Sequence, residues 1–583
     1  MLSDSKTGYP SIDKPWLKYY KNDAPNMPSP DMSIFDFLYR NNTGSLDCVA
    51  LNYFGNRITY RKLFDNIEAV AASLQAIGVK NGDIVTLCAL NTPEFIYLLY
   101  ALNKIGAVSN WIGITSPETD LHEQLLQTKS RIVFTVDIAF EKIKKASVDT
   151  NVGRIITVPI YQSMPALIKM IVKLKSKKGS TLNKYNWSSF LKESGDRFDV
   201  IDIAGEDIAV IEYTGGSTGK PKGVMLSNKA LNSYYVNLST ANSNGIFNYE
   251  KSDRYLSGVP FFLAFGLNVC CHSPLSHSME LVLAPDPNPD AGTDLILNAK
   301  VQHVVGGRLL VEGMLDKAHK KQSNLSYVKS VVYGGEEANT TWERKVINEL
   351  NKNNAAALLI NGYGMTETSA ATLVEINNDT AEFIPLANIK IMIADPEDST
   401  HELGYDTEGE LCISSDTLMA GYYNNDYETQ EVLFEKDNTR WLKTRDLATV
   451  SADGLVKITG RIKRIYSRID SDGIQSRVYP MRIEEALAEH GLVKQSAVIG
   501  IKDDLLAYKS VAYIIPSIEG IDENDAKRRL QIHCHEKLPD SHQPDEYVFV
   551  ERLPITRAGK VDYRDLERMA QDRLQSVGRT GII

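Results

Sequence analysis

The sequence lacks long apolar runs, paired cysteines and an excess of basic residues, and each absence narrows what the protein can be. No stretch approaches the ~18 consecutive apolar residues of a membrane-spanning helix, and no charged-then-apolar leader opens the chain. The 6 cysteines show no paired spacing, which is typical of a reducing compartment. The net charge of −10 argues against nucleic acid as the main partner, because that usually requires a basic face. We therefore expect a cytoplasmic protein that does not bind nucleic acid.

The composition that remains is that of an ordinary globular protein of more than one domain. Hydrophobic residues make up 43% and charged residues 24%, and 583 residues are too many for one core. Thr59 begins an amphipathic helix that Gly78 ends, an apolar strand follows at 84–90, and Thr92-Pro93-Glu94 starts another helix. With a strand near 107–111, this order predicts a βαβ unit and a parallel sheet.

The clearest functional signal is the segment YTGGSTGKPKG, Tyr213–Gly223, which follows a short apolar strand predicted at 208–211. Glycines let backbone N–H groups crowd around an anion, and hydroxyl and lysine side chains add donors and positive charge. The pattern is not a Walker A loop, because Thr214 replaces a required glycine and Pro221 replaces Ser or Thr. A polyphosphate site and a solvated Gly/Ser turn both fit the segment alone. The candidate nucleotide-binding residues here are Thr214, Gly215, Gly216, Ser217, Thr218, Gly219, Lys220 and Lys222.

A second signal is NGYGMTET, Asn361–Thr368, directly after an apolar run predicted to be a strand. Ligands of open α/β sheets bind at the C-terminal ends of strands, where this segment would present an aromatic face and backbone amides. The alternative is a capped helix start at Thr366 with no ligand. Three further segments are YGGEE (residues 333–337), WLKTRDLATVSADG (441–454) and PITRAGKVDYRDL (554–566).

In their order along the chain, these segments resemble the motifs of the adenylate-forming superfamily, which contains acyl- and aryl-CoA synthetases, peptide synthetase adenylation domains and luciferases. The resemblance begins near residue 59 and covers most of the chain. It implies that Tyr363 stacks on adenine, that Asp446 binds the ribose hydroxyls, and that Glu367 holds Mg²⁺. One departure is Arg445, which stands where the family usually has glycine in T-G-D.

The resemblance also supplies the remaining candidate residues. Lys560, on an exposed turn, would bridge the carboxylate and the α-phosphate, and Thr366 would contact the α-phosphate. Arg461 would be a second ribose or phosphate contact. The catalytic candidates are Lys560, Thr366 and Glu367, with Glu367 as the metal ligand. The further nucleotide-binding candidates are Gly335, Glu336, Asn361, Gly362, Tyr363, Gly364, Asp446 and Arg461.

The expected fold class is α/β, with two domains joined by a hinge at Lys463. Residues 1–461 would form a large N-terminal domain of layered sheets and helices. Residues 464–583 would form a small mobile α+β domain that carries Lys560, with strands predicted at 497–501, 510–515 and 547–550 and a helix at 525–537. We also expect a loop over Ser467–Arg477, longer than the glycine-rich loop usual at this point in the family.

The implied activity is ATP-dependent activation of a carboxylic acid to an acyl adenylate, followed by thioester formation with CoA. In Pro260–Gly266, Leu263 stands where amino-acid-activating domains place an aspartate, and a leucine cannot pair an ammonium. The acid is therefore expected to be apolar. Two alternatives are a ligase that loads a carrier-protein phosphopantetheine and a catalytically silent nucleotide sensor.

One further segment, residues 164–178, has the sequence MPALIKMIVKLKSKK. At helical spacing, Met164, Leu167, Ile168, Ile171 and Leu174 form one stripe, opposite a stripe of lysines. This pattern is typical of an interfacial helix that contacts anionic lipid, and also of a surface helix packed on its domain. It predicts a peripheral membrane contact, with ordinary packing as the alternative.

Overall fold

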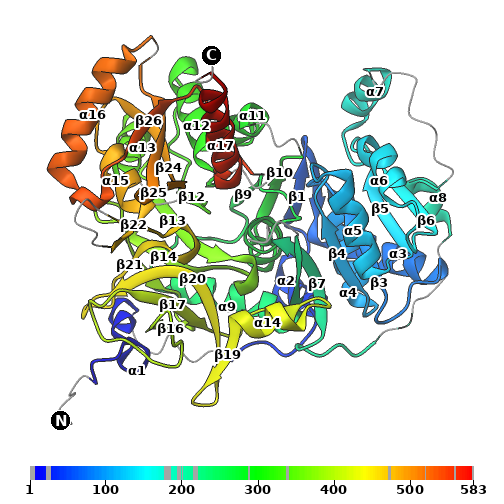
Figure 1. The fold of residues 1–583 in the computed structure, drawn as a ribbon. Coiled ribbons are helices and arrows are strands. Elements are labelled where there is room, and N and C mark those ends of the chain that lie inside the picture. The colour runs from blue at the N-terminus through cyan, green and yellow to red at the C-terminus, as the bar shows by residue number, and fades with distance from the viewer. Residues whose placement is uncertain are drawn as a thin grey trace.

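The computed structural model describes residues 7–20, 28–175, 185–193, 199, 201–214, 221–285, 289–335, 340–469, 475–503, 505–518, 520–556 and 560–580. It shows a large N-terminal part built on two sheets and a smaller C-terminal part, coloured orange to red in Figure 1. The predicted α/β class is confirmed.

The first sheet is the predicted parallel sheet, extended at one edge. Its strands run in the order β18 (Gly421–Tyr422), β8 (Lys222–Ser227), β7 (Ile208–Thr214), β4 (Val108–Ile112), β3 (Ile84–Cys88), β5 (Ile132–Val136) and β6 (Arg154–Val158). From β6 to β7 the strands are parallel, and β7, β8 and β18 pair antiparallel. The helices of this part are α3 (Tyr60–Ala76), α4 (Pro93–Lys104), α5 (Glu118–Thr128), α6 (Phe140–Ala146), α7 (Ala166–Lys175) and α8 (Trp187–Lys192).

The second sheet is larger and changes from parallel to antiparallel along its width. Its parallel half contains β1 (Val49–Tyr53), β10 (Glu280–Leu283), β9 (Arg254–Ser257), β11 (His303–Val305), β12 (Ser330–Gly334) and β13 (Leu358–Met365), with β2 (Asn56–Thr59) antiparallel at the edge. Its antiparallel half contains β14 (Ala370–Asn377), β15 (Glu382–Pro385), β21 (Val456–Arg461), β20 (Thr439–Val450), β17 (Gly409–Ser414), β16 (Lys390–Ala394) and β19 (Leu433–Lys436). The helices of this part are α1 (Pro10–Asp13), α2 (Ile34–Asn42), α9 (Asn228–Ser243), α10 (Ser273–Ser276), α11 (Pro289–Ala299), α12 (Arg308–Lys321), α13 (Thr340–Lys352) and α14 (Asp426–Val432).

The C-terminal part has its own cores and begins just after the predicted hinge. It contains the sheet β24 (Val493–Asp503), β25 (Ala507–Pro516) and β26 (Glu546–Phe549), with helices α15 (Pro480–Ala488), α16 (Glu523–Lys537) and α17 (Tyr563–Thr580). Arg464 is anchored to this part, because its Nη2 lies 2.5 Å from Glu484 Oε1 and its guanidinium lies over the ring of Tyr563. The chain therefore becomes fixed to the small part directly after Lys463, and the boundary at 461–464 stays a prediction.

The expectation of a loop over Ser467–Arg477 was wrong. Strands β22 (Tyr466–Ile469) and β23 (Gln475–Val478) pair antiparallel, and residues 470–474 between them lie outside the described chain. Tyr466 and Val478 face each other in the register and are buried in a core of the C-terminal part. Burial of these two ends stabilises a hairpin, which the polar residues between them did not indicate.

Pro260–Gly266 forms a turn that leads into a buried π-helix, Phe265–His272. That helix is held at its end by His272, whose Nδ1 and Nε2 lie 3.0 Å from Tyr100 Oη and Asn232 Oδ1. Leu263 is half-buried.

The apolar residues predicted to form one stripe from Met164 to Leu174 do not share one environment in the structure. Met164 is buried and Ile168 and Val172 pack on the main core, so these residues form the inward face. Leu167, Met170 and Ile171 are exposed at 74%, 56% and 49%. Among the described residues, no helix is both long and apolar enough to cross a bilayer.

Candidate active site

Three predicted nucleotide-binding residues meet where strands β13, β20 and β21 lie together. Tyr363 donates a hydrogen bond from its hydroxyl to Asp446 Oδ2 at 2.6 Å, and Arg461 Nε lies 2.9 Å from Asp446 Oδ1. The register of β20 and β21 places Asp446 directly opposite Arg461. Burial, together with the neighbouring Asp446 carboxylate, raises the pKa of Tyr363 and keeps its hydroxyl protonated. A carboxylate fixed from both sides is suited to accept hydrogen bonds from two ribose hydroxyls.

The predicted metal ligand lies on a short turn that follows β13. Glu367 belongs to the 3₁₀ turn η6 (Thr366–Thr368), in which Thr368 Oγ1 donates to Met365 O at 2.9 Å. Glu367 Oε1 accepts a hydrogen bond from the Tyr422 hydroxyl at 2.8 Å, and burial with this carboxylate raises the pKa of Tyr422. Thr366 is half-buried on the same turn. No local pattern in the sequence indicated Tyr422 as a partner of Glu367.

Tyr422 also contacts Lys222 at the start of β8, the strand that follows the glycine-rich segment. Lys222 Nζ lies 4.9 Å from the centroid of the Tyr422 ring and 2.5 Å from Glu428 Oε2 on α14. A cavity of about 200 Å³ opens here, lined by Gln127, Pro221, Lys222, Gly223, Tyr422, Tyr423, Asn424, Asn425 and Glu428. Glu428, which sequence reasoning missed, therefore fixes the Lys222 ammonium at the edge of this cavity.

The predicted catalytic lysine reaches the main sheet from the C-terminal part. Gly335, directly after β12, has a φ of +77°. A Cβ at this position would lie 3.1 Å from Lys560 Cε and 3.6 Å from Lys560 Nζ, so the lysine side chain passes close over the glycine. The backbone around Lys560 is held by Thr556, whose Oγ1 accepts from Lys560 N at 3.2 Å. The fold thus brings Lys560 to the strand edge that was expected to bind adenine.

Some of the other predicted nucleotide-binding residues lie in the described chain, and the rest lie outside it. Thr214 ends β7 opposite Lys222, Gly362 lies opposite Gly334 of β12, and Gly364 lies near the end of β13. Asn361 is buried and its side chain lies near Glu375 rather than in open solvent. Predicted residues that lie outside the described chain are Gly215, Gly216, Ser217, Thr218, Gly219, Lys220 and Glu336.

A pair of buried carboxyl groups lies on α13 and β14, and no local pattern in the sequence indicates it. Glu343 on α13 accepts a hydrogen bond from the Tyr333 hydroxyl, and Glu375 on β14 lies near Glu343. Burial, and then the neighbouring Glu343, raises the pKa of Glu375 to about 8. Like charges in one apolar space cannot both be ionised without a large cost, so one proton is retained by the pair.

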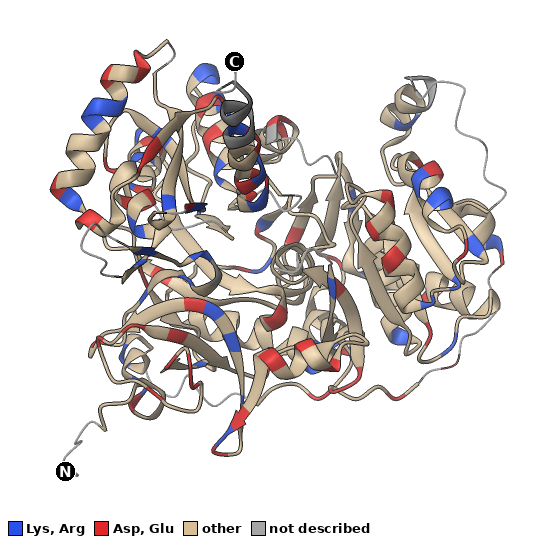
Figure 2. Ribbon diagram, in the orientation of Figure 1, with Lys and Arg blue, Asp and Glu red and all other residues tan. Residues whose placement is uncertain are grey.

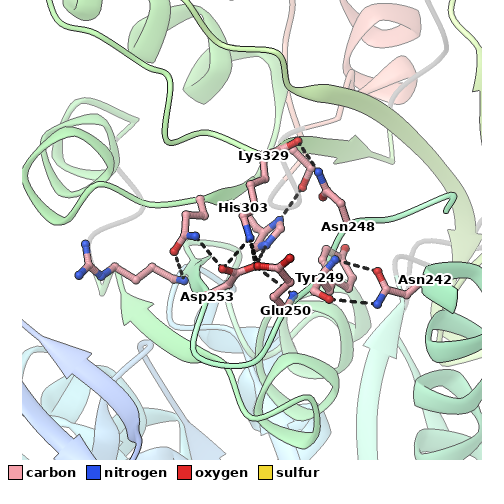
Figure 3. Close-up of polar contacts among 10 residues, drawn as sticks. Asn242, Asn248, Tyr249, Glu250, Asp253, His303 and Lys329 are labelled. Carbon is pink, nitrogen blue, oxygen red and sulfur yellow. Dashed lines mark hydrogen bonds and ion pairs between the residues drawn. The ribbon is translucent and has the colours of Figure 1, made fainter.

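A second polar cluster, shown in Figure 3, has the residue types of a hydrolase triad but is structural. His303 Nε2 lies 2.9 Å from Asp253 Oδ2, and His303 Nδ1 lies 2.9 Å from Ser330 Oγ. Lys329 Nζ also contacts Asp253, at 3.0 Å. His303 and Ser330 are completely buried, so no substrate can reach the hydroxyl. The cluster joins β9, β11 and β12.

Comparison with known protein families identifies the family of the chain. The profile described as "AMP-binding enzyme" matches residues 38–423, and "AMP-binding enzyme C-terminal domain" matches 482–560. The chain belongs to the AMP-binding enzyme family. The predicted membership of the adenylate-forming superfamily and the predicted enzyme class, an AMP-forming acid–thiol ligase, are confirmed.

Relatives of this AMP-binding enzyme align over nearly the whole chain. It is 26% identical over 575 residues to "Long-chain-fatty-acid--CoA ligase" of Bacillus subtilis, covering 95% of this chain and 97% of the relative. It is 25% identical to "Acyl-CoA ligase sidI" of Aspergillus fumigatus, covering 91% and 90%. The solved anthranilate CoA ligase AuaEII in complex with anthranoyl-AMP superposes with a TM-score of 0.78 at 22% identity, covering 94% of this chain and 99% of that chain. This last likeness confirms the fold.

Proposed function

We propose that this enzyme converts an apolar carboxylic acid into its CoA thioester in two steps. A carboxylate oxygen attacks the α-phosphorus of ATP, forming the acyl adenylate as pyrophosphate leaves. The CoA thiol then attacks the acyl carbonyl, forming the thioester as AMP leaves. The names of the relatives, long-chain-fatty-acid and acyl-CoA ligases, support this choice of acid and acceptor.

The observation that carries the proposal is the position of Lys560 over Gly335. Both reactants of the first step are anions, so the enzyme must hold them together and neutralise charge as it develops. Lys560 supplies a cation at the edge where Tyr363 and Asp446 would hold the nucleoside. The small domain would then rotate on the hinge at Lys463 and admit the thiol.

The residues present suit one Mg²⁺ ion bound together with the nucleotide phosphates. Mg²⁺ is usually held by one or two carboxylates plus phosphate oxygens, and the described residues contain no cluster of three or more His, Cys, Asp or Glu ligands. Glu367 would be its protein ligand, oriented by the Tyr422 hydroxyl. When bound, the ion would reduce the negative charge of the phosphates. Thr366 would donate to the α-phosphate, and the segment Thr214–Lys222 would hold the departing pyrophosphate.

A panel of carboxylic acids, scored by AMP release with and without CoA, tests the proposal. We expect an apolar acid to give the highest rate, and we expect CoA to increase AMP release. Half-burial of Leu263, which offers no partner for an ammonium, favours this acid class over α-amino acids. Highest activity with an α-amino acid would contradict the assignment.

Two alternatives predict different outcomes of the same experiment. A carrier-loading ligase would release AMP at a rate that ignores CoA and rises with a phosphopantetheinylated carrier protein. A silent nucleotide sensor would bind ATP but would catalyse no acid-dependent exchange of pyrophosphate into ATP. The joint presence of Lys560, Glu367 and Asp446 favours catalysis over sensing.

We also propose that α7 contacts an anionic membrane. Figure 1 shows this helix at the outer edge of the N-terminal part, and Leu167, Met170 and Ile171 expose apolar surface on it. The sequence places Lys169, Lys173 and further lysines along the same segment, and Figure 2 shows blue positions on the helix. Apolar side chains beside cations suit the boundary between lipid tails and anionic headgroups, where each lysine contributes roughly 1 kcal/mol.

Co-sedimentation with anionic vesicles tests this contact. We expect binding at low salt, weaker binding at high salt, and loss of binding in the double variant Leu167→Ser with Ile171→Ser. The control is Ile138→Ser, which removes an exposed apolar side chain elsewhere on the same part of the molecule. Equal pelleting of the double variant and the control would show that α7 does not mediate the contact.

A further inference from the structure

A pocket that has no part in the nucleotide site lies beside α7. It has a volume of about 450 Å³ and lies between strand β2, the first three turns of α3, the first two turns of α4, residues 162–163 and α8. That volume is within the usual range of small-molecule sites, about 300–1,000 Å³. None of its lining residues is among the predicted or observed residues of the active site.

The pocket contains a buried carboxyl group with unused hydrogen-bonding capacity. Glu94 is 1% exposed, and its Oε1 accepts a hydrogen bond from Ser163 Oγ at 2.5 Å. Among the described residues, no donor lies within hydrogen-bonding distance of Glu94 Oε2. Burial raises the pKa of this carboxyl, while Ser163, the Glu94 backbone N–H and the Thr92 hydroxyl lower it. A buried polar atom without a partner is costly, so a ligand donor at this position would recover that cost. The aromatic side chains of Tyr97 and Trp187, both largely buried, also line the pocket and suit a cationic ligand group.

The mouth of the pocket carries positive charge, opposite in sign to the Glu94 carboxylate. Arg57 and Lys62 are exposed lining residues, and Arg57 is oriented by an ion pair with Glu280 at 2.8 Å. On the α7 side, Lys169 Nζ donates to the backbone oxygen of Gln162, another lining residue, at 2.9 Å. In a protein with a net charge of −10, this local group of cations favours an anionic ligand group.

We infer that this pocket binds a small zwitterion of the phosphoethanolamine type, with its primary ammonium at Glu94 Oε2 and its phosphate at Arg57 and Lys62. The ammonium can donate N–H hydrogen bonds to the carboxylate while it faces the aromatic side chains. The phosphate can accept from the two cations at the mouth. Such a zwitterion occurs free and as a lipid headgroup. The lipid form rests on the proposed membrane contact, because Lys169 of α7 contacts the lining residue Gln162. The free form does not.

Calorimetric titration of the full-length protein with O-phosphoethanolamine tests the inference. We expect saturable binding, and at least tenfold weaker binding of phosphocholine, whose quaternary ammonium has no N–H to donate. Glu94→Gln should weaken phosphoethanolamine binding at least tenfold, and Lys62→Met should weaken it several-fold. Lys144→Met, an exposed lysine on α6, is the matched control and should bind as wild type. Acid-dependent AMP release should be unchanged in all three variants, which confirms that they are folded.

Three results would overturn the inference: no saturable binding to the wild type, equal binding by Glu94→Gln, or equal binding of phosphoethanolamine, phosphocholine and inorganic phosphate.

Vesicles of phosphatidylcholine and phosphatidylglycerol, with and without phosphatidylethanolamine, distinguish the lipid headgroup from the free zwitterion. Pelleting that phosphatidylethanolamine increases in the wild type, but not in Glu94→Gln, assigns the lipid headgroup. Pelleting unaffected by that lipid, with soluble binding retained, assigns the free zwitterion. Absence of all pelleting would reject the α7 membrane contact alone.

Discussion

Removal of the Asp446 carboxylate charge is the sharpest test of the nucleotide site. In the variant Asp446→Asn the side chain keeps its shape. Its remaining oxygen can still accept from Arg461 Nε, which lies 2.9 Å from Asp446 Oδ1 in the wild-type protein. The change removes the negative charge that is expected to bind the ribose hydroxyls. Loss of a hydrogen bond to a charged group costs about 1.5–3 kcal/mol. Since about 1.4 kcal/mol is a factor of ten, the KM for ATP should rise roughly 10- to 100-fold.

The assay measures AMP release while ATP is varied at saturating acid, and then while acid is varied at saturating ATP. The KM for the acid should stay near its wild-type value, because Asp446 is predicted to contact only the nucleoside. Tyr363→Phe is the matched comparison, since it removes the 2.6 Å hydrogen bond to Asp446 but keeps the aromatic face for adenine. Its KM for ATP should rise less than that of Asp446→Asn.

The opposite pattern would refute the reasoning. If Asp446→Asn left the KM for ATP unchanged and raised the KM for the acid, the carboxylate would belong to the acid site. Melting temperatures of both variants separate a binding effect from a folding defect, because Asp446 is buried among β-strands.

Three further predictions concern single side chains. Lys560→Ala should slow acid-dependent pyrophosphate exchange about 10²- to 10³-fold while sparing thioester formation from pre-made acyl adenylate, and wild-type exchange would reject this assignment. Glu375 has a folded pKa of about 8 against an ordinary 4.5, so its contribution to stability is present below pH 4.5 and is lost as pH rises to about 8. The free energy of unfolding of Glu375→Gln should therefore rise relative to that of the wild type between pH 5 and 8, by at most about 1.4 kcal/mol per pH unit, as measured by denaturant unfolding; a constant difference would contradict the raised pKa. Arg445 has a φ of +62°, so Arg445→Gly should stabilise the fold by up to about 1 kcal/mol, and a lower melting temperature would show that the arginine side chain matters more than the backbone.

Most of the candidate nucleotide site could be predicted from the sequence because its residues occur in short segments at strand ends. Asn361–Met365 follows a run of apolar residues, and Asp446 lies on a strand that turns back at Gly454. Arg445 departs from the family pattern, and the structure shows why glycine is usual at this position. Arg445 occupies a left-handed conformation that favours glycine, and its backbone N–H donates to Glu410 Oε1 at 3.0 Å.

The partners of these residues could not be predicted, because they come from distant parts of the chain. Tyr422 lies 55 residues after Glu367, yet its hydroxyl orients the predicted metal ligand. Glu428 lies 206 residues after Lys222. Neither a tyrosine nor a glutamate carries a local signal for such a contact. The hairpin at Tyr466–Val478 was missed for the same reason, since burial of its two ends depends on the surrounding core.

By itself, the sequence determined the α/β class and the family, and it located the candidate nucleotide-binding motifs, because local patterns of glycine, apolar and charged residues are sufficient for these. Only the tertiary structure decided which face of α7 is exposed, how Lys560 comes to lie over Gly335, and that Glu94 lies in a separate pocket. Each of these depends on how two elements distant in sequence pack together. Helical or strand periodicity gives the faces of one element, but the element that covers each face is chosen by packing.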